Sequence, residues 1–379
     1  MHIIYFLTYD YSFKSWDEDG NLSREITYFK KFKEVDENIF YTFITFGDKS
    51  DMKYLENVDK HKIIPIYEYL PYFKNKYLRF FVSLYIPFKL KKLLNDVPID
   101  VIKQNQLQGS WISILFKLLI NKPLIIRTGY DVLTFKIKEK KSKLIILFYK
   151  LLTIISLKFS DLYTVTTNVD REFLNQNFKN HKKIKLRRNF VYLDENNFYN
   201  KNFSSRESKV ICVGRLEPQK NFNYLLEELK NQDIEIVIYG NGSEKQKLVK
   251  QSLNNKSSVD FKGQIDNKNI FKILGNSKFF ISSSLYEGNP KSILEAMYCG
   301  CIVFASKTDN TSEIITNGKD GFLYNLEKDE LRSSFLSNLL DDKQLESISR
   351  NARKRVEVNN SIDALVKLEI SDFNEIIQK

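Results

Sequence analysis

Short apolar runs alternate with longer, helix-compatible stretches along the whole chain. In the first half these runs cover residues 2–8, 39–46, 99–103, 124–128 and 162–167. In the second half they cover residues 210–214, 234–240, 258–263, 279–283 and 302–306. Short apolar runs between helical stretches are typical of βα units, so the pattern predicts parallel sheets covered by helices.

A polar stretch rich in Asn and Ser, residues 188–208, separates the two series of runs and predicts a linker. The length of 379 residues fits two domains. We therefore predict an α/β fold with two Rossmann-like, doubly wound domains, residues 1–190 and 205–358, that face each other across a cleft. In such sheets, ligands bind beyond the carboxyl ends of the strands.

A strand-to-helix junction in the second domain carries two carboxylates eight positions apart, Glu287 and Glu295. Asn289 is a favoured N-cap residue and Pro290 suits the first helical position, so a helix is predicted to begin there and to end at Gly300. Helix N-termini attract anions, and a rise of ~1.5 Å per residue puts Glu295 roughly 9 Å from Asn289, comparable to a diphosphate. The candidate donor-binding residues of this junction are Gly288, Asn289, Pro290, Lys291 and Glu295.

Two further turns follow predicted strands of the second domain. Gly214 begins a loop with two cations, Arg215 and Lys220, which could both reach a diphosphate, although surface cations on a solvated loop are the alternative. The turn Gly240-Asn241-Gly242 permits close backbone approach, but it lacks the third glycine of a dinucleotide fingerprint.

Taken in order, these motifs resemble the donor-binding half of the family 4 glycosyltransferases of GT-B fold, over roughly residues 210–352. The residues that carry the resemblance are Gly214-Arg215-Leu216, Lys220, Gly240-Asn241-Gly242, Phe261-Lys262-Gly263, Glu287 through Met297, and Gly300. The resemblance implies that Glu287 contacts the donor sugar, that Glu295 contacts the ribose, and that Arg215 and Lys220 bind the diphosphate. It also implies a retaining reaction without a metal or other cofactor, and a C-terminal helix, residues 359–379, that crosses back to the first domain.

The first domain resembles a bacterial subgroup of these enzymes more weakly. The candidate residues of its side of the cleft, for donor or acceptor, are Gly20, Asn105, Gln106, Arg127, Thr128 and Asp131. Many family members carry a His directly before the glycine that corresponds to Gly129, whereas this chain carries a threonine. Arg127, Asp131 or the backbone could replace that contact, and Arg127 could equally form a structural ion pair.

The net charge of +12 suits phosphorylated substrates, an anionic membrane or nucleic acid, but also a solvated surface. Residues 76–94 and 136–158 combine apolar, aromatic and basic side chains. They could contact a membrane peripherally, but we favour helices that pack on the sheet with their lysines in water. No nucleic-acid recognition motif is present, so nucleic acid is not an expected partner.

The chain has three cysteines without a Cys-x-x-Cys spacing and three scattered histidines, which disfavours a disulfide framework, a zinc site and a histidine general base. No signal peptide is evident, so we expect a cytoplasmic protein, peripheral at the inner face of the cell membrane if the membrane is contacted.

The resemblance thus implies a retaining glycosyltransferase. The expected reaction moves a sugar from a nucleotide diphosphate sugar to a hydroxyl acceptor, a bacterial envelope glycan or lipid-linked saccharide. A sugar-nucleotide epimerase or hydrolase on the same fold is the alternative, and a nucleic-acid-binding protein is a distant one.

Overall fold

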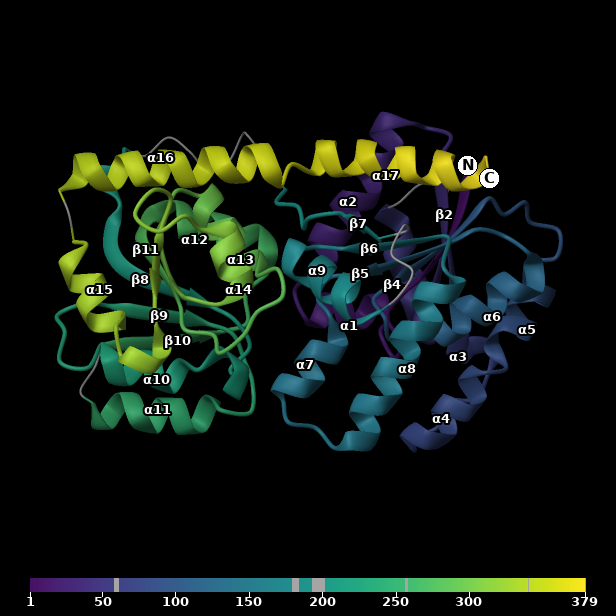
Figure 1. The fold of residues 1–379 in the computed structure, drawn as a ribbon, viewed down its shortest axis with the longest axis horizontal. Helices are drawn as coiled ribbons and strands as arrows, with labels where there is room; N and C mark the ends of the chain where they lie inside the picture. The colour runs from purple at the N-terminus through teal and green to yellow at the C-terminus, as the bar shows by residue number, and fades with distance from the viewer. Residues whose placement is uncertain (58–60, 179–183, 193–201, 256–257, 340, 379) are drawn as a thin grey trace. The chain divides into compact units, whose positions relative to one another are not determined.

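The computed structural model of the chain describes residues 1–57, 61–178, 184–192, 202–255, 258–339 and 341–378. The chain forms two compact units (Figure 1). Unit 1 comprises Met1–Arg187 and Asp363–Lys379, and unit 2 comprises Arg188–Ile362. Each unit contains one parallel sheet with helices between successive strands, so the predicted fold class is confirmed.

Unit 1 is built on a seven-stranded sheet of order β3-β2-β1-β4-β5-β6-β7. Its strands are β1 (His2–Phe6), β2 (Phe40–Thr45), β3 (Lys62–Pro65), β4 (Val101–Asn105), β5 (Leu124–Thr128), β6 (Leu162–Val165) and β7 (Ile184–Leu186). Its helices are α1 (Phe13–Glu18), α2 (Leu22–Val35), η1 (Lys49–Asn57), α3 (Ile66–Tyr69), α4 (Lys76–Ser83), α5 (Ile86–Leu93), α6 (Ser110–Ile120), α7 (Val132–Lys138), α8 (Lys143–Phe159), α9 (Asn168–Asn177) and α17 (Ile362–Ile377).

Unit 2 is built on a six-stranded sheet of order β10-β9-β8-β11-β12-β13. Its strands are β8 (Glu207–Val213), β9 (Ile236–Tyr239), β10 (Val259–Gly263), β11 (Ser277–Ser282), β12 (Ile302–Ser306) and β13 (Phe322–Tyr324). Its helices are η2 (Phe203–Ser205), η3 (Pro218–Lys220), α10 (Phe222–Glu228), α11 (Lys245–Asn254), α12 (Asn267–Asn276), α13 (Lys291–Tyr298), α14 (Asp309–Ile314), η4 (Leu326–Lys328), α15 (Leu331–Ser337) and α16 (Asp342–Asn359).

Both faces of the unit 2 sheet are buried. Val210, Phe279 and Phe304 belong to one hydrophobic cluster, while their sequence neighbours Ile211, Phe280 and Val303 belong to another. Successive side chains of a strand point to opposite faces, so continuous apolar runs supply both clusters. This is why the central strands were predictable from sequence.

Three strands were not predicted: β3, β7 and β13. Each lies at an edge of its sheet, and each has only three or four residues. An edge strand pairs on one side only and needs few buried side chains, so its apolar run is too short to stand out. The predicted linker, residues 188–208, belongs to unit 2, and residues 193–201 of it lie outside the described residues.

The C-terminal helix α17 belongs to unit 1, as predicted, where Lys103 Nζ of β4 donates to Glu369 Oε2 at 2.6 Å. Arg187 Nε and Nη2 donate to the two oxygens of Asp372 at 2.7 and 2.6 Å. The sequence also predicts an apolar stripe on this helix, Ile362, Leu365, Leu368 and Ile370, and this prediction was wrong at Leu368, which is exposed. The buried face instead consists of Ile362, Leu365, Val366, Glu369, Asp372, Phe373 and Ile376. Two paired acidic residues therefore occupy positions that a purely hydrophobic pattern overlooks.

Candidate active site

The strand order of unit 2 reverses between β8 and β11. These strands pair in parallel, with Val210 opposite Phe279, and the chain leaves them toward opposite edges of the sheet. The loop after β8 leads into η3, and the loop after β11 leads into α13. Doubly wound sheets bind ligands outside the carboxyl ends of the strands at such a reversal. The candidate site of unit 2 therefore lies where these two loops meet.

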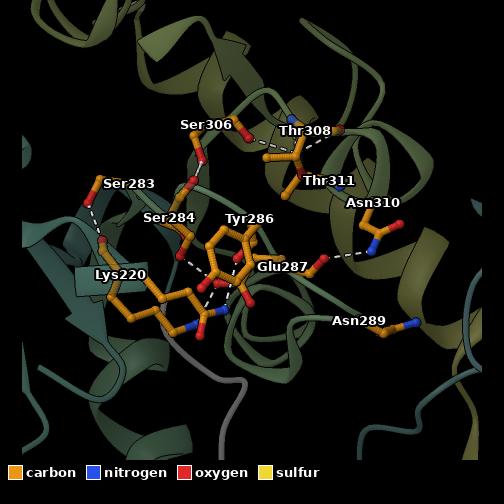
Figure 2. A network of polar contacts seen from close by, with 12 residues as sticks. Lys220, Ser283, Ser284, Tyr286, Glu287, Asn289, Ser306, Thr308, Asn310 and Thr311 are labelled. Atoms are coloured by element: carbon orange, nitrogen blue, oxygen red, sulfur yellow. Dashed lines mark hydrogen bonds and ion pairs between the residues drawn. The ribbon is translucent and has the colours of Figure 1, made fainter. Parts of the chain in front are cut away.

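Lys220 and Glu287, both predicted site residues, form an ion pair at this point. Lys220 Nζ donates to Glu287 Oε1 at 2.5 Å, and Ser284 Oγ donates to the same oxygen at 2.5 Å (Figure 2). The two charged side chains are 16% and 7% exposed. Because both are largely removed from water, the geometry of the pair is fixed by its surroundings rather than by free rotation in solvent.

Hydrogen bonds between the two loops hold this ion pair in place. Ser283 Oγ donates to the carbonyl of Lys220 at 2.9 Å. Gln219 Nε2 donates to the carbonyl of Tyr286 at 2.9 Å, and the N–H of Leu285 donates to the Gln219 carbonyl at 2.8 Å. The backbone on either side of the pair is thus fixed, so Lys220 cannot move away without breaking several contacts.

Asn310, at the start of α14, supports the Glu287 loop from the other side. Its Nδ2 donates to the Glu287 carbonyl at 2.6 Å, and Ser306 Oγ donates to the Ser284 carbonyl at 2.6 Å (Figure 2). Neither Asn310 nor Ser284 was among the predicted site residues. The local signal for α14 is its capping box between Thr308 and Thr311, which places the helix start but not its contact with the Glu287 loop.

The predicted glycines pack backbone against backbone. A Cβ atom added to Gly240, whose φ is +149°, would lie 1.9 Å from the Gly214 carbonyl oxygen. At Gly242 it would lie 2.4 Å from the Leu216 carbonyl oxygen. At Gly214 it would meet the Lys220 side chain at 3.3 Å. These glycines therefore let the β9 turn lie against the loop that carries Lys220.

Helix α13 begins one residue later than predicted. Pro290 is the N-cap, with an extended ψ of 102°, and Lys291 is the first helical residue. The prediction of an Asn289 N-cap was therefore wrong, because Pro290 keeps an extended conformation before the first turn. The predicted end was correct: Gly300 has φ +75° and donates its N–H to the Met297 carbonyl at 3.0 Å.

The remaining donor-site residues of unit 2 lie on the loops after β8 and β11, on helix α13, after β9 and at the end of β10. Gly288, Asn289, Pro290 and Glu295 are buried, and Lys291 is half-buried. Figure 2 shows the Asn289 side chain pointing away from Glu287. Arg215 is exposed, and no contact with a described residue joins its side chain to Lys220 or Glu287. Asn241 is also exposed, and the Gly263 carbonyl accepts from the Gly240 N–H at 2.7 Å.

In unit 1 the strand order reverses between β1 and β4, and the predicted residues lie at the ends of β4 and β5, in the loops after them, and after α1. Gln106 has φ +71°, and its Oε1 accepts from the Gly129 N–H at 2.9 Å. Its own N–H donates to the Arg127 carbonyl at 2.7 Å. Gln106 thus connects the loops after β4 and β5. Gly20 has φ +67°, and Asn105 is buried at the end of β4.

Two other predicted residues of unit 1 have structural contacts. Asp131 is the N-cap of α7, where its Oδ1 accepts from the Thr134 N–H at 2.6 Å. Burial raises the pKa of the Asp131 carboxyl. Thr128 Oγ1 donates to the Thr164 carbonyl at 3.3 Å, and Arg127 is half-buried at the end of β5. The polar groups of Asp131 and Thr128 therefore stabilise the backbone at the end of β5 and at the start of α7.

Histidine does not contribute to either reversal point in the described part of the chain. His2 bonds to Pro98 and Thr42, His61 accepts from the Tyr41 N–H at 2.8 Å, and His181 lies outside the described residues. Among the residues that the structure describes, no three His, Cys, Asp or Glu side chains form a group that could hold a metal ion.

Comparison with known proteins relates unit 2 to one family. The family model described as Glycosyl transferases group 1 matches residues 194–355, nearly all of unit 2. Unit 2 therefore resembles the group 1 glycosyltransferases over these residues. The chain is 26% identical over 302 residues to the UDP-Gal:alpha-D-GlcNAc-diphosphoundecaprenol alpha-1,3-galactosyltransferase of Escherichia coli, covering 74% of this chain and 75% of the relative.

Solved structures show that the chain has the GT-B fold. The crystal structure of Anabaena HepE in complex with UDP and glucose matches with a TM-score of 0.75 and 16% identity, over 99% of this chain and 100% of that chain. The sucrose-phosphate synthase of Thermosynechococcus elongatus matches with a TM-score of 0.81 and 14% identity, over 100% of each chain.

Proposed function

We propose that the chain is a glycosyltransferase that moves a sugar, with retention of configuration and without a metal ion, from a nucleotide diphosphate sugar to a hydroxyl acceptor. The observation that carries the proposal is the buried contact between Lys220 and Glu287 at the strand reversal of unit 2. A fixed cation beside a fixed carboxylate is suited to a ligand that carries a diphosphate next to sugar hydroxyls.

Each side chain has a distinct role in the proposed reaction. Lys220, Arg215 and the N-terminus of α13 stabilise the negative charge that develops on the departing diphosphate. Glu287 accepts hydrogen bonds from donor sugar hydroxyls, and Glu295 from the ribose. Because Arg215 is exposed, it reaches the diphosphate as a mobile arm, whereas Lys220 is already in position.

The transfer forms a bond between the acceptor oxygen and the anomeric carbon while the bond from that carbon to the diphosphate breaks. The diphosphate keeps the bonding electron pair. The acceptor attacks the face that the diphosphate leaves, and a departing phosphate oxygen takes the hydroxyl proton. This route needs no histidine base, in agreement with the structural contacts of His2 and His61.

The acceptor of the proposed reaction is a lipid-linked saccharide or envelope glycan. Support comes from the Escherichia coli relative, whose name specifies UDP-Gal as donor and a diphosphoundecaprenol-linked sugar as acceptor. The complex of Anabaena HepE with UDP and glucose supports a uridine nucleotide. We therefore expect UDP to stabilise the protein against heat more than GDP or ADP does.

The decisive experiment measures nucleotide release from UDP-sugars with and without a diphosphoundecaprenol-linked saccharide. Acceptor-dependent release supports transfer, whereas equal release without acceptor identifies the hydrolase alternative. Conversion of the donor sugar without nucleotide release identifies the epimerase. Arg215→Ala is expected to lower turnover by roughly 100-fold or more with an unchanged melting temperature, since its side chain is exposed. Unchanged turnover would remove Arg215 from the phosphate site.

A further inference from the structure

Unit 1 exposes a continuous apolar surface on three helices. We call it the basic apolar face and define it by Tyr77, Leu78 and Phe81 of α4, Phe88 of α5, and Leu144, Leu147, Phe148 and Leu151 of α8. All eight side chains are exposed. Leu144 is 79%, Tyr77 67% and Phe81 65% exposed, values that are unusual for large apolar side chains.

These helices bury one side against unit 1, and their solvent-exposed side is apolar as well. On α8, Leu152, Thr153, Ser156 and Leu157 are buried, while Leu144, Leu147 and Leu151 lie outside. Contacts join α4 to α8: the rings of Phe80 and Phe148 lie 6.2 Å apart. Figure 1 shows α4 and the start of α8 together at the lower edge of unit 1. The exposed side chains of α4 and α8 are therefore neighbours, and α5, which carries Phe88, follows α4 directly in the chain.

The positive charge of the protein is concentrated in the same two segments. Residues 76–94 and 136–158 contain twelve lysines and arginines and one acidic residue, a net charge of +11, against +12 for the whole chain. The other 337 residues, with 47 basic and 46 acidic side chains, are nearly neutral. The net charge is therefore a property of these two segments, which supply the face, rather than of the whole chain.

The arrangement of charge and apolar groups is that of an interfacial surface. Lys138, Lys140, Lys141 and Lys143 surround the turn that precedes α8, directly beside the highly exposed Leu144. Lysines can extend toward lipid phosphates while neighbouring leucines and aromatic rings enter the acyl boundary. In the described part of the chain, no helix is both long and apolar enough to span a bilayer.

We infer that the basic apolar face docks unit 1 on the surface of an anionic lipid bilayer. Our sequence-based preference, helices packed on the sheet with only their lysines in water, does not account for the exposed leucines and aromatic rings of this face. The inference goes beyond the proposed transfer reaction, because docking needs neither donor nor acceptor.

Two other occupants fit less well. A second copy of the chain would bring two faces of like charge together, which opposes association. Nucleic acid would satisfy the lysines but would leave the aliphatic side chains of α8 without apolar partners, since nucleic-acid sites use aromatic rings for stacking. An anionic bilayer satisfies both the charge and the apolar groups.

The test is co-sedimentation of the full chain with vesicles of phosphatidylcholine alone or of equal parts phosphatidylcholine and phosphatidylglycerol. Wild type is expected to bind the anionic vesicles and to bind phosphatidylcholine weakly. A charge variant combines Lys140→Glu, Lys141→Glu and Lys143→Glu. Each lysine near the lipid surface contributes roughly fivefold to binding, so loss of three is expected to lower partitioning of the protein onto anionic vesicles about 100-fold. An apolar variant, Tyr77→Ser with Phe81→Ser and Leu144→Ser, is expected to lower it by roughly tenfold or more.

Matched controls change exposed lysines and exposed apolar side chains in unit 2. Lys250→Glu with Lys319→Glu and Lys354→Glu, and Leu253→Ser with Val358→Ser, alter exposed side chains and should leave vesicle binding unchanged apart from a uniform weak charge effect. Melting temperatures and UDP binding should match wild type in all variants.

Three outcomes would overturn the inference. The first is absence of wild-type binding to anionic vesicles, and the second is equal loss in face and control variants. The third is concentration-dependent dimerisation or salt-sensitive oligonucleotide binding that the face variants abolish while vesicle binding persists. If wild type binds anionic vesicles but shows no acceptor-dependent turnover, the result counts against the proposed reaction and not against docking.

Discussion

Lys103 of β4 and Glu369 of α17 form an ion pair of 2.6 Å whose side chains are only 1% and 5% exposed. Tyr28 of α2 donates its hydroxyl proton to the same Glu369 carboxylate. Tyr28 and Lys103 come from the first third of the chain and Glu369 from its end, so this contact closes unit 1 around its C-terminal helix. A buried ion pair is weak evidence for net stability, but loss of one partner leaves a charge without compensation.

The first prediction therefore concerns this pair. Glu369→Ala should lower the free energy of unfolding by about 3–5 kcal/mol, because it leaves the Lys103 ammonium buried and unpaired. Lys103→Met combined with Glu369→Leu removes both charges and should recover much of the loss. Urea unfolding followed by circular dichroism measures both. A double variant less stable than Glu369→Ala would contradict the explanation.

The Lys220–Glu287 pair leads to a second prediction. Lys220→Met should reduce turnover by roughly 100-fold or more, because a positioned cation is lost from the leaving-group site. It should also lower stability by about 1–3 kcal/mol, because Glu287 keeps only its Ser284 partner at that oxygen. Lys250→Met, which changes an exposed lysine on α11, is the control. Equal turnover of both variants would exclude Lys220 from the reaction.

Gly240 gives a third prediction, on stability. Gly240→Ala should destabilise unit 2 by more than about 2 kcal/mol, since the new Cβ atom would lie 1.9 Å from the Gly214 carbonyl oxygen in a backbone conformation of φ +149°. Gly318→Ala is the matched control, because Gly318 also has a positive φ, +74°, but nothing lies within 4 Å of its Cβ position. It should cost only about 1–2 kcal/mol. Thermal unfolding measures both variants, and similar losses of stability in Gly240→Ala and Gly318→Ala would contradict the packing argument.

A fourth prediction separates nucleotide binding from chemistry. Glu295→Ala should weaken UDP binding while the turnover of bound donor changes less, because the proposed ribose contact is remote from the reacting carbon. Isothermal titration with UDP gives the affinity, and saturation kinetics give turnover. Unchanged affinity with a normal melting temperature would refute the ribose role.

Asp170 provides a prediction on pH. Burial, followed by the charge of Asp131, raises the pKa of the Asp170 carboxyl to about 7 in the folded protein, whereas an unfolded Asp titrates near ~3.9. The folded state therefore holds the carboxyl proton of Asp170 more tightly than the unfolded state does. The stability that this proton contributes is present below pH ~4 and is lost as pH rises through about 7.

Above about pH 7 the folded protein must keep the ionised Asp170 carboxylate buried, which lowers stability. Asp170→Asn removes this charge without changing the shape of the side chain. The variant should be more stable than wild type at pH 8, and the difference should shrink or reverse at pH 4. Melting temperatures across this range provide the measurement. A difference that does not vary with pH would show that Asp170 does not titrate as inferred.

The sequence by itself determined the local features of this protein. Central strands such as β8, β11 and β12 each contain three or four consecutive apolar residues that are buried, so their runs are visible in the sequence. Gly300 was predictable as the end of α13, because a glycine at a left-handed position stops a helix locally. Glu287 and Lys220 were found because each belongs to a motif of a few neighbouring residues.

The tertiary structure alone decided which of these residues meet. Lys220 contacts Glu287 across 67 positions because β8 and β11 are neighbours in the sheet, a pairing that no local pattern encodes. The same holds for Asn310 on the Glu287 loop, and for Glu369, which lies 266 positions from Lys103. Backbone propensity and side-chain periodicity act over a few residues, whereas such contacts depend on how strands and helices pack, and packing is a property of the whole fold.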